Sequence, residues 1–210
     1  MTGDLFIITA PSGAGKTSLV NALLQQSENM ALSVSHTTRP KRPGERHAID
    51  YYFINDDEFR SLQSENAFLE HANVFGYHYG TSKNKVKEQL ASDLDVILEI
   101  DWQGAEQIKQ HFAQSLAPKA ISIFILPPSR DVLQERLHNR GQDSPEVIAN
   151  RLSSAHTDMQ QLRLQHFDYW VVNNDFQTAL ADLRAIVRSE RLRKARQLHQ
   201  LKPLLDSWEI

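Results

Sequence analysis

A short apolar run, a glycine-containing turn and a helical pattern follow one another near the start of the chain. The run covers Leu5 to Thr9, the turn covers Ala10 to Gly15, and Thr17 to Gln26 has apolar residues at helical spacing. The turn ends in Gly15-Lys16-Thr17, as does the phosphate-binding pattern G-x-x-x-x-G-K-[ST]. This order restricts the chain to folds in which a buried strand leads through a phosphate-binding turn into a helix.

The residue types in this turn suit a nucleotide. Glycines let backbone N–H groups converge on phosphate oxygens, and the helix N-terminus adds partial positive charge. Lys16 can reach the β- and γ-phosphates, and the Thr17 hydroxyl can ligate Mg²⁺. Ala10 replaces the first glycine of the pattern, a position that needs only a negative φ. The alternative, a turn that binds nothing, does not explain Lys16 and Thr17 together. The expected nucleotide-binding residues are Ala10, Pro11, Ser12, Gly13, Ala14, Gly15, Lys16, Thr17 and Ser18.

The rest of the chain alternates between strand and helix patterns. Apolar runs predict buried strands at Val96 to Ile100, Ile121 to Leu126 and Trp170 to Val172. Helical patterns occur at Asn84 to Ser92, Gly104 to Gln114, Arg130 to His138 and Thr178 to Leu198. Such alternation predicts an α/β fold, with a parallel sheet covered by helices on both faces. Two segments interrupt it: a small mixed insertion at about 36–82 and an arginine-rich helical segment at about 130–163.

The composition excludes several classes of protein. The 210 residues include 23 Lys plus Arg and 26 Asp plus Glu but no cysteine, which excludes a disulfide framework, an iron–sulfur cluster and a thiol nucleophile. The formal net charge of −3 gives no general attraction to nucleic acid or anionic lipid. The apolar runs are far shorter than the ~20 residues of a membrane span, and the N-terminus does not resemble a signal peptide. We expect a cytoplasmic protein with no nucleic-acid or membrane partner.

The insertion begins with residues suited to binding a phosphate group. Prolines stiffen the loop that holds Arg39 and Arg42 three residues apart, and guanidinium groups offer paired, planar hydrogen bonds to phosphate. Tyr51 and Tyr79 lie in aromatic stretches that supply phenol donors. The alternative for the two arginines is a solvated basic loop beside an aromatic core. On the residues alone, both interpretations stay open.

Four stretches, taken together, resemble guanylate kinase. They are Ala10 to Thr17, Ser35 to Glu45, Tyr77 to Ser82 and Ile100 to Gly104. The resemblance runs from about Leu5 to Leu192. It implies a P-loop nucleoside-monophosphate kinase fold in one domain, with a core at about 1–35, 83–129 and 164–210. The insertion at about 36–82 would bind GMP, and the segment at about 130–163 would form a helical lid.

The resemblance also implies roles for individual residues of the acceptor site. Arg39, Arg42, Tyr51 and Tyr79 would hold the phosphate of GMP, whereas Ser35, Glu70, Thr81 and Asp101 would hold guanine. The chemistry agrees, because a carboxylate can accept from N1–H and the 2-amino group while a hydroxyl donates to O6. Thr81 stands where the family often has serine and keeps the hydroxyl. Without the resemblance, Glu70 is better interpreted as a surface residue of a helix at Glu65 to Ala72.

The arginine-rich segment would cover the transferring phosphates. By similarity to the family, Arg140 and Arg151 contact them after the lid closes, with Arg136 close by; the alternative is solvated helical arginines balanced by nearby acids. The expected catalytic residues are Lys16, Arg39, Arg42, Arg140 and Arg151. The basic stretch from Arg184 to Arg196 is interpreted as a solvated helix face. Asn173-Asn174-Asp175 lies where such folds pass the donor base.

The expected reaction is ATP + GMP giving ADP + GDP, with Mg²⁺ bound to ATP and to Thr17, in purine nucleotide metabolism. The expected partners are therefore the two small-molecule substrates, and a homo-oligomer is possible. Two other functions stay open: a non-catalytic guanylate-kinase-like module that binds proteins, and a kinase for another nucleoside monophosphate. The presence of Lys16-Thr17 and the lid arginines distinguishes an enzyme from a binding module.

Overall fold

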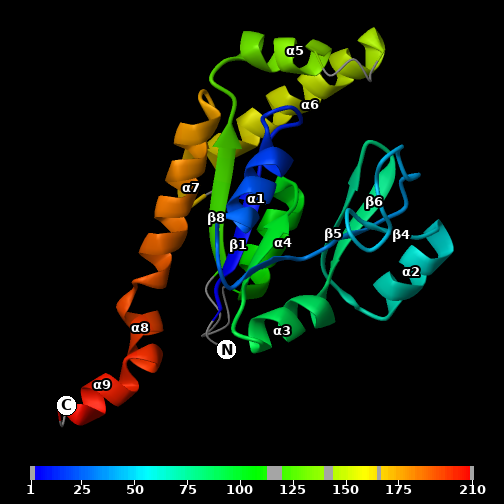
Figure 1. Cartoon of the computed structure of the whole chain (residues 1–210). Helices are drawn as coiled ribbons and strands as arrows, with labels where there is room; N and C mark the ends of the chain where they lie inside the picture. Colours follow the sequence, from blue (N-terminus) through cyan, green and yellow to red (C-terminus); the bar gives the residue numbers. More distant parts are fainter. Residues whose placement is uncertain (1–2, 113–119, 140–143, 165–166, 209–210) are drawn as a thin grey trace.

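A parallel five-stranded sheet forms the centre of the molecule (Figure 1). The computed structural model describes residues 3–112, 120–139, 144–164 and 167–208. The strands are β1 (Leu5–Thr9), β2 (Met30–Leu32), β7 (Asp95–Glu99), β8 (Ala120–Leu126) and β9 (Tyr169–Val172), in the order β2-β7-β1-β8-β9. All neighbouring pairs are parallel. The predicted α/β fold is confirmed, although the sequence pattern missed the three-residue edge strand β2.

Helices cover both faces of this sheet because each strand at its centre is apolar on both sides. On one face, α1 (Lys16–Gln25) and α7 (Phe176–Arg191) pack against side chains such as Phe6 and Ile8. On the other, α3 (Lys83–Ala91) and α4 (Trp102–Phe112) pack against Leu5 and Ile7. The five residues of β1 are all buried. The carboxyl ends of the strands therefore reach one edge of a rigid, fully packed layer, where β1 meets the glycine-containing turn.

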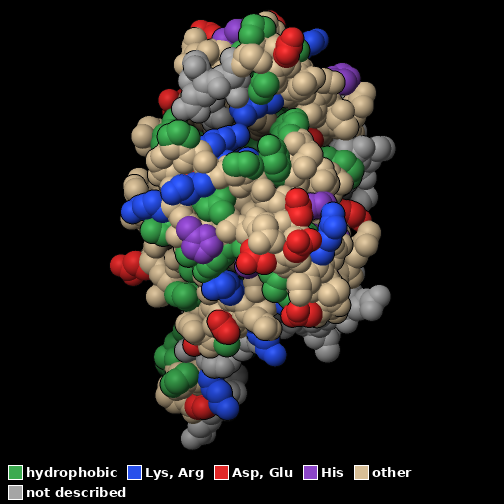
Figure 2. Space-filling view, turned by 90° about the vertical axis from the view of Figure 1, so that its right-hand side faces the viewer, with side chains coloured by type: hydrophobic (Ala, Val, Ile, Leu, Met, Phe, Trp, Pro, Cys, Tyr) green, Lys and Arg blue, Asp and Glu red, His purple; other side chains and the backbone are tan. Residues whose placement is uncertain are grey.

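Residues 36–82 form a second, mixed sheet. Its strands are β3 (His36–Thr37), β4 (Tyr52–Phe53), β5 (Phe68–Val74) and β6 (Tyr77–Ser82), in the order β4-β3-β6-β5. The helix α2 (Asp56–Ser64) begins at a capping box of Asn55 and Glu58, and its Phe59 ring stacks on Phe68. Figure 2 views the side of the molecule that carries this sheet; acidic and basic side chains are interspersed there among polar and apolar ones.

The alternative interpretation, a surface helix at Glu65 to Ala72, is wrong. Most of this stretch belongs to β5, whose residues pair with β6 in an antiparallel hairpin. The hairpin turn at Phe75-Gly76 has positive φ at both residues, and a glycine accommodates that backbone at no steric cost. Strand pairing with β6 thus outweighs the local helical pattern, and it places Glu70 on a sheet rather than on a solvated helix.

Two helices lie at the carboxyl ends of the strands. They are α5 (Arg130–Asn139) and α6 (Pro145–Leu164), and both appear at the top of Figure 1. A small cluster of their own apolar side chains, including Leu133, Leu137 and Ile148, joins them. This cluster is separate from the two clusters on the sheet faces.

The C-terminal part of the chain differs from the single helix predicted for Thr178 to Leu198. The helix α7 ends at Arg191, and α8 (Lys194–Gln200) and α9 (Lys202–Ser207) continue away from the sheet (Figure 1). Residues five apart on a continuous helix point about 140° apart. The break at Leu192 allows both Arg191 and Arg196 to contact buried Asp95, with nitrogen–oxygen distances of 2.7 Å each.

The interpretation of this basic stretch as a solvated face is therefore wrong for Arg191 and Arg196. Arg196 also pairs with Asp4, and its side chain is only 12% exposed. Removing one partner from a buried ion pair costs about 3–5 kcal/mol, because the other charge stays desolvated. These contacts attach the C-terminal helices to the sheet at the end opposite the glycine-containing turn. Among the described residues, no helix is both long and apolar enough to cross a membrane.

Candidate active site

The turn between β1 and α1 has the backbone of a phosphate-binding loop. Gly13 and Gly15 have φ of 92° and 94°, in the left-handed region that favours glycine. A Cβ on Gly15 would overlap the side chain of Asn173, whose Nδ2 donates to the Ala14 carbonyl at 2.7 Å. A Cβ on Gly13 would lie 2.9 Å from a methyl group of Leu137 in α5. The loop conformation is thus held by β9 and α5 as well as by its own glycines.

Lys16 and Thr17 begin α1 and contact the end of the neighbouring strand. Lys16 Nζ donates to the Ile100 carbonyl at 3.0 Å, and Thr17 Oγ1 donates to the carboxylate of Glu99. Glu99 is the last residue of β7, which pairs with β1. Glu99 was not among the residues predicted from the sequence. Its position at the end of a predicted strand could have placed it near the phosphate loop, because the carboxyl ends of parallel strands meet at one edge of the sheet.

Arg39 is held rigidly inside the insertion. Its guanidinium pairs with Glu45 at 2.7 Å, donates to the Pro40 carbonyl at 2.8 Å, and lies 5.5 Å from the centre of the Tyr51 ring. The residue is only 8% exposed. Burial opposes the ionisation of Glu45, but hydrogen bonds from Arg39 and from the Arg42 backbone lower its pKa overall. The solvated-loop interpretation is wrong for Arg39, whereas Arg42 is exposed.

The two predicted tyrosines lie beside Arg39. The rings of Tyr51 and Tyr79 meet edge-to-face with centroids 5.9 Å apart. Burial, and then the charge of Glu99, raise the pKa of the Tyr51 hydroxyl well above its usual value. Tyr51 therefore stays a neutral hydrogen-bond donor at any physiological pH. Because the charge of Glu99 acts on its pKa, Tyr51 lies within electrostatic range of the end of β7.

Glu70 and Thr81 face each other across β5 and β6. Thr81 Oγ1 donates to Glu70 Oε1 at 2.5 Å, and both residues are buried. Burial, opposed by the Thr81 hydrogen bond and reinforced by the charge of Asp101, raises the pKa of Glu70 to about 7. The charge of Lys16 acts in the opposite direction. The structure thus brings Glu70, Thr81 and Asp101 together, within electrostatic range of the phosphate loop.

The remaining predicted base-site residues lie at the same junction. Asp101 Oδ1 accepts a hydrogen bond from the Gly104 backbone at 2.9 Å and so caps the first turn of α4. Ser35 is buried immediately before β3, and its carbonyl accepts from the Tyr52 backbone. Both residues are therefore fixed by backbone contacts of the surrounding elements.

The helices α5 and α6 bring further charged groups to the loop. Arg136 Nη2 donates to the Asn173 carbonyl at 3.0 Å, while its Nη1 is buried with no hydrogen-bond partner among the described residues. Asp158, on α6, was missed by the sequence analysis. Burial, and then the charge of Asp101, raise the pKa of Asp158 to about 6, while Lys16 and a hydrogen bond with Trp102 lower it. Asp158 thus joins α6 to the core.

Of the two arginines predicted for the lid, the structure describes only one. Arg140 lies outside the described residues. Arg151 is partly buried on α6. Asn173, expected near the donor base, contacts the phosphate loop directly through its hydrogen bond with Ala14.

An enzyme that transfers a phosphoryl group between two nucleotides must bind both and exclude water from the reacting phosphates. This chain has a phosphate loop on its main sheet, a rigid arginine–tyrosine group on its second sheet, and two helices at the loop. The fold and site are those of a P-loop kinase acting on a nucleoside monophosphate.

Comparisons with known proteins give the family. The sequence model described as guanylate kinase matches residues 2–190. The chain is 52% identical over 205 residues to a guanylate kinase of Shewanella sp. (strain MR-7), covering 97% of this chain and 96% of the relative. It is 54% identical over 206 residues to that of Escherichia coli (strain K12), with the same coverage. The chain therefore belongs to the guanylate kinase family.

A solved structure agrees with this assignment. The guanylate kinase from Anaplasma phagocytophilum matches with a TM-score of 0.74 at 33% sequence identity. The match covers 98% of this chain and 94% of that chain. The likeness thus extends over the sheet, the insertion and the helices at the loop.

Proposed function

We propose that this chain transfers the γ-phosphoryl group of ATP to GMP, giving ADP and GDP, through the residues described above. The observation that carries the proposal is the buried pair of Glu70 and Thr81 beside Asp101, close enough to Lys16 for its charge to act on Glu70. A carboxylate and a hydroxyl in that pairing match the N1–H and 2-amino donors and the O6 acceptor of guanine. The match selects a guanine nucleotide as acceptor.

On the donor side, the loop from Ala10 to Ser18 would bind the phosphates of ATP. Its backbone N–H groups and the start of α1 supply fixed partial charges, and Lys16 supplies a full one. The hydroxyl of Thr17 and the carboxylate of Glu99 are hard oxygen donors that already lie in contact, so they fit Mg²⁺. When bound with ATP, Mg²⁺ would neutralise phosphate charge, held by Thr17 with Glu99 beside it.

On the acceptor side, Arg39, Arg42, Tyr51 and Tyr79 would hold the phosphate of GMP. Glu45 and the Pro40 carbonyl each engage one terminal nitrogen of Arg39 and fix its plane. A guanidinium has five N–H donors, so further donors stay available for a phosphate. The acceptor phosphate is itself the nucleophile, and no general base is required. These side chains therefore act by orientation and charge neutralisation.

The lid would complete the site by bringing arginines to the transferring phosphate. Arg136 supports this role, because its Nη1 is a buried donor with no hydrogen-bond partner in the described part of the chain. Arg151, together with Arg140 outside the described residues, would add charge in the closed state. We propose that the insertion and the lid move against the core, and that the reaction takes place in the cytoplasm on the two free nucleotides.

The proposal is tested by measuring ADP release in a coupled assay with GMP, IMP, AMP and UMP as acceptors. We expect kcat/KM to fall in the order GMP, IMP, AMP. IMP lacks only the 2-amino group, whereas AMP presents a lone pair at N1 to the Glu70 carboxylate. Sites built on hydrogen bonds can reject such a partner by ~10⁴-fold. AMP or UMP used as well as GMP would overturn the guanine assignment, and no turnover with any acceptor would overturn the enzymatic one.

A further inference from the structure

The strand that carries Glu70 is an edge strand, and within the described residues no strand lies on its outer side. In the order β4-β3-β6-β5, the strand β5 pairs only with β6. Backbone groups that point away from β6 need other partners, because an unpaired buried peptide group is costly. At His71, directly after Glu70, a side chain of the core helix α4 supplies them.

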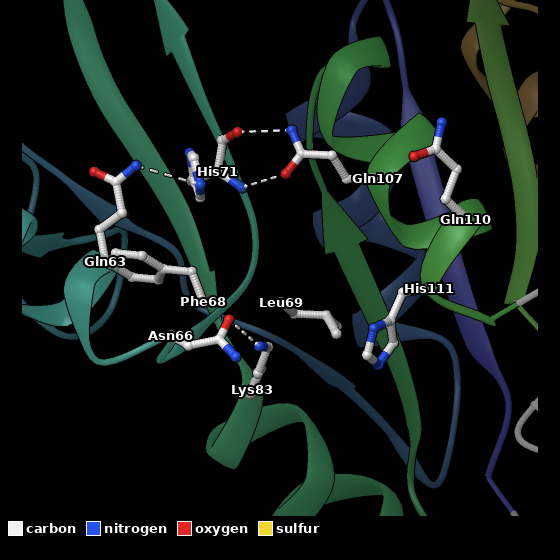
Figure 3. A pocket seen from close by; sticks show the side chains of 9 residues that line it. All are labelled: Gln63, Asn66, Phe68, Leu69, His71, Lys83, Gln107, Gln110 and His111. Carbon is white, nitrogen blue, oxygen red and sulfur yellow. Dashed lines mark hydrogen bonds between the residues drawn. The ribbon is translucent and has the colours of Figure 1, made fainter.

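Gln107 provides both hydrogen bonds that a neighbouring strand would provide. Its Oε1 accepts from the His71 backbone N–H at 3.1 Å, and its Nε2 donates to the His71 carbonyl at 2.8 Å. Figure 3 shows the amide of Gln107 reaching from α4 to the His71 peptide, with both bonds drawn. One core side chain thus fixes the backbone of the insertion at the residue next to Glu70.

The same face of α4 also limits the position of the Glu70 carboxylate. Gly104 lies three residues before Gln107, hence on the same side of the helix. A Cβ on Gly104 would overlap Glu70 Oε2, so the carboxylate rests directly against the helix backbone. Asp101 lies a further three residues back and accepts the Gly104 N–H at 2.9 Å. Asp101, directly before α4, and Gly104 and Gln107, in its first two turns, therefore lie on the side of the helix that faces β5.

Packing is incomplete beside the contact of Gln107 with His71. A cavity of about 410 Å³ opens beside the Gln107–His71 contact, between the insertion and α4. Its other lining side chains are mainly polar and include Gln63, Asn66, Lys83, Gln110 and His111 (Figure 3). Leu69 of β5 packs against the apolar cluster on this face of the sheet. The two hydrogen bonds from Gln107 add directional contacts that fix the position of the strand at His71.

We infer that Gln107 is a positioning residue for base selection: it holds β5 against α4 so that the Glu70 carboxylate meets the guanine edge. The inference rests on the proposed role of Glu70 in binding GMP. Gln107 does not touch the substrate in this arrangement. Its loss is expected to act on the acceptor base alone and to leave the phosphate loop unaffected.

The test replaces Gln107 by methionine, which has similar length and no amide. We expect the KM for GMP to rise about tenfold, because the loss of a buried hydrogen bond typically weakens binding by about that factor. The kcat should change by less than about twofold, and the KM for ATP should not change. The ratio of kcat/KM for GMP to that for IMP should fall. GMP has two donors, N1–H and the 2-amino group, that must align with the Glu70 carboxylate, whereas IMP has only N1–H, so a displaced carboxylate weakens GMP binding more.

Gln110→Met is the matched control. Gln110 lies one turn further along α4 and lines the same cavity, but its amide bonds Glu106 of its own helix. This variant should keep the wild-type KM for GMP and the wild-type ratio of GMP to IMP. Thermal unfolding of both variants separates a stability effect from a positional one. If Gln107→Met proves unstable, Gln107→Glu keeps the acceptor for the His71 N–H and should give a smaller change in the same ratio.

Two results would overturn the inference. One is an unchanged GMP to IMP ratio in folded Gln107→Met or Gln107→Glu, and the other is an equal rise in the KM for ATP and for GMP. The wild-type ratios distinguish this failure from that of the proposed function. If the wild-type enzyme does not prefer GMP over IMP, the proposed role of Glu70 in binding guanine fails. If the wild-type enzyme prefers GMP and the Gln107 variants keep the same preference, only the role of Gln107 fails.

Discussion

The phosphate loop and the base site differ in how they are built. The loop is one contiguous stretch, and its chemistry comes from backbone N–H groups, two left-handed glycines and the start of a helix. The base site collects Ser35, Glu70, Thr81 and Asp101 from elements far apart in the chain. A local site of this kind depends mainly on allowed backbone conformations. An assembled site depends on strand pairing and burial, and it therefore acquires a shifted pKa and a dependence on positioning residues.

The comparison predicts that the loop controls turnover whereas the base site controls selection. Lys16→Ala should lower kcat by ~10²-fold or more, because it removes a preorganised cation from the transferring phosphates. GMP affinity should change little when it is measured near pH 8, above the Glu70 pKa of about 7. Coupled ADP-release kinetics and equilibrium binding of GMP measure the two effects.

Lys41→Ala removes a lysine from an exposed loop position and serves as the charge control. It should keep both kcat and GMP affinity. Near-normal turnover in Lys16→Ala, or a loss of GMP affinity as large as the loss of kcat, would contradict the separation of roles.

A change at Glu70 should alter the choice of acceptor base rather than the turnover of bound substrates. Glu70→Gln should lower kcat/KM for GMP by up to ~10²-fold, because an amide accepts one hydrogen bond but turns a donor toward the second guanine donor. IMP should suffer less, so the preference for GMP over IMP should narrow. Steady-state kinetics with both acceptors, at saturating ATP, give the ratio. If the ratio of kcat/KM for GMP to that for IMP is the same in Glu70→Gln as in the wild type, Glu70 does not contact the base.

The pKa of Glu70 predicts how acceptor binding depends on pH. The ionised form is needed to accept both guanine donors, and burial raises the pKa of Glu70 to about 7. The KM for GMP should therefore fall about tenfold between pH 6 and pH 8, as the ionised fraction rises by that factor. The same series with Glu70→Gln corrects for titration of the GMP phosphate and should be flatter. Identical profiles for the two proteins would contradict the assignment.

The same shift has a consequence for stability with a definite sign. The folded carboxyl, with its raised pKa, binds a proton that the unfolded chain releases near pH 4.5. The free energy of unfolding should thus decrease as the pH rises from about 4.5 to about 7, by a few kcal/mol at most. Urea unfolding at pH 5 and pH 8 should show this decrease in wild type and a smaller one in Glu70→Gln.

The smallest effect is expected at the first position of the loop. Ala10 does not have a positive φ, so the glycine usual in the pattern is not required there. Ala10→Gly should change kcat and both KM values by less than about twofold. Gly15→Ala is the matched contrast, because its left-handed backbone and its contact with Asn173 leave no room for a Cβ. Equal effects of the two substitutions would show that the loop does not depend on backbone conformation.

Much of the core could be predicted from local pattern. The strands β1, β7, β8 and β9 and the helix α1 all lie within a residue or two of the predicted ranges. The edge strand β2 was missed because three partly buried residues carry no clear periodicity. The break after α7 was missed because its cause, the contacts of Arg191 and Arg196 with Asp95, lies across the chain. The assigned roles of the site residues stay predictions until the variants are measured.

The roles of the arginines and tyrosines of the insertion came with the family resemblance and stay predictions. By itself, the sequence determined the phosphate loop and the α/β class. These features depend on short-range spacing, which fixes backbone conformation and periodic burial locally. Only the tertiary structure decided that Glu70 lies on a strand beside Thr81, that Glu99 meets Thr17, and that Gln107 binds His71. Such contacts join residues 11 to 82 positions apart, and their partners are selected by strand pairing and by the need to satisfy buried polar groups, which no local pattern records.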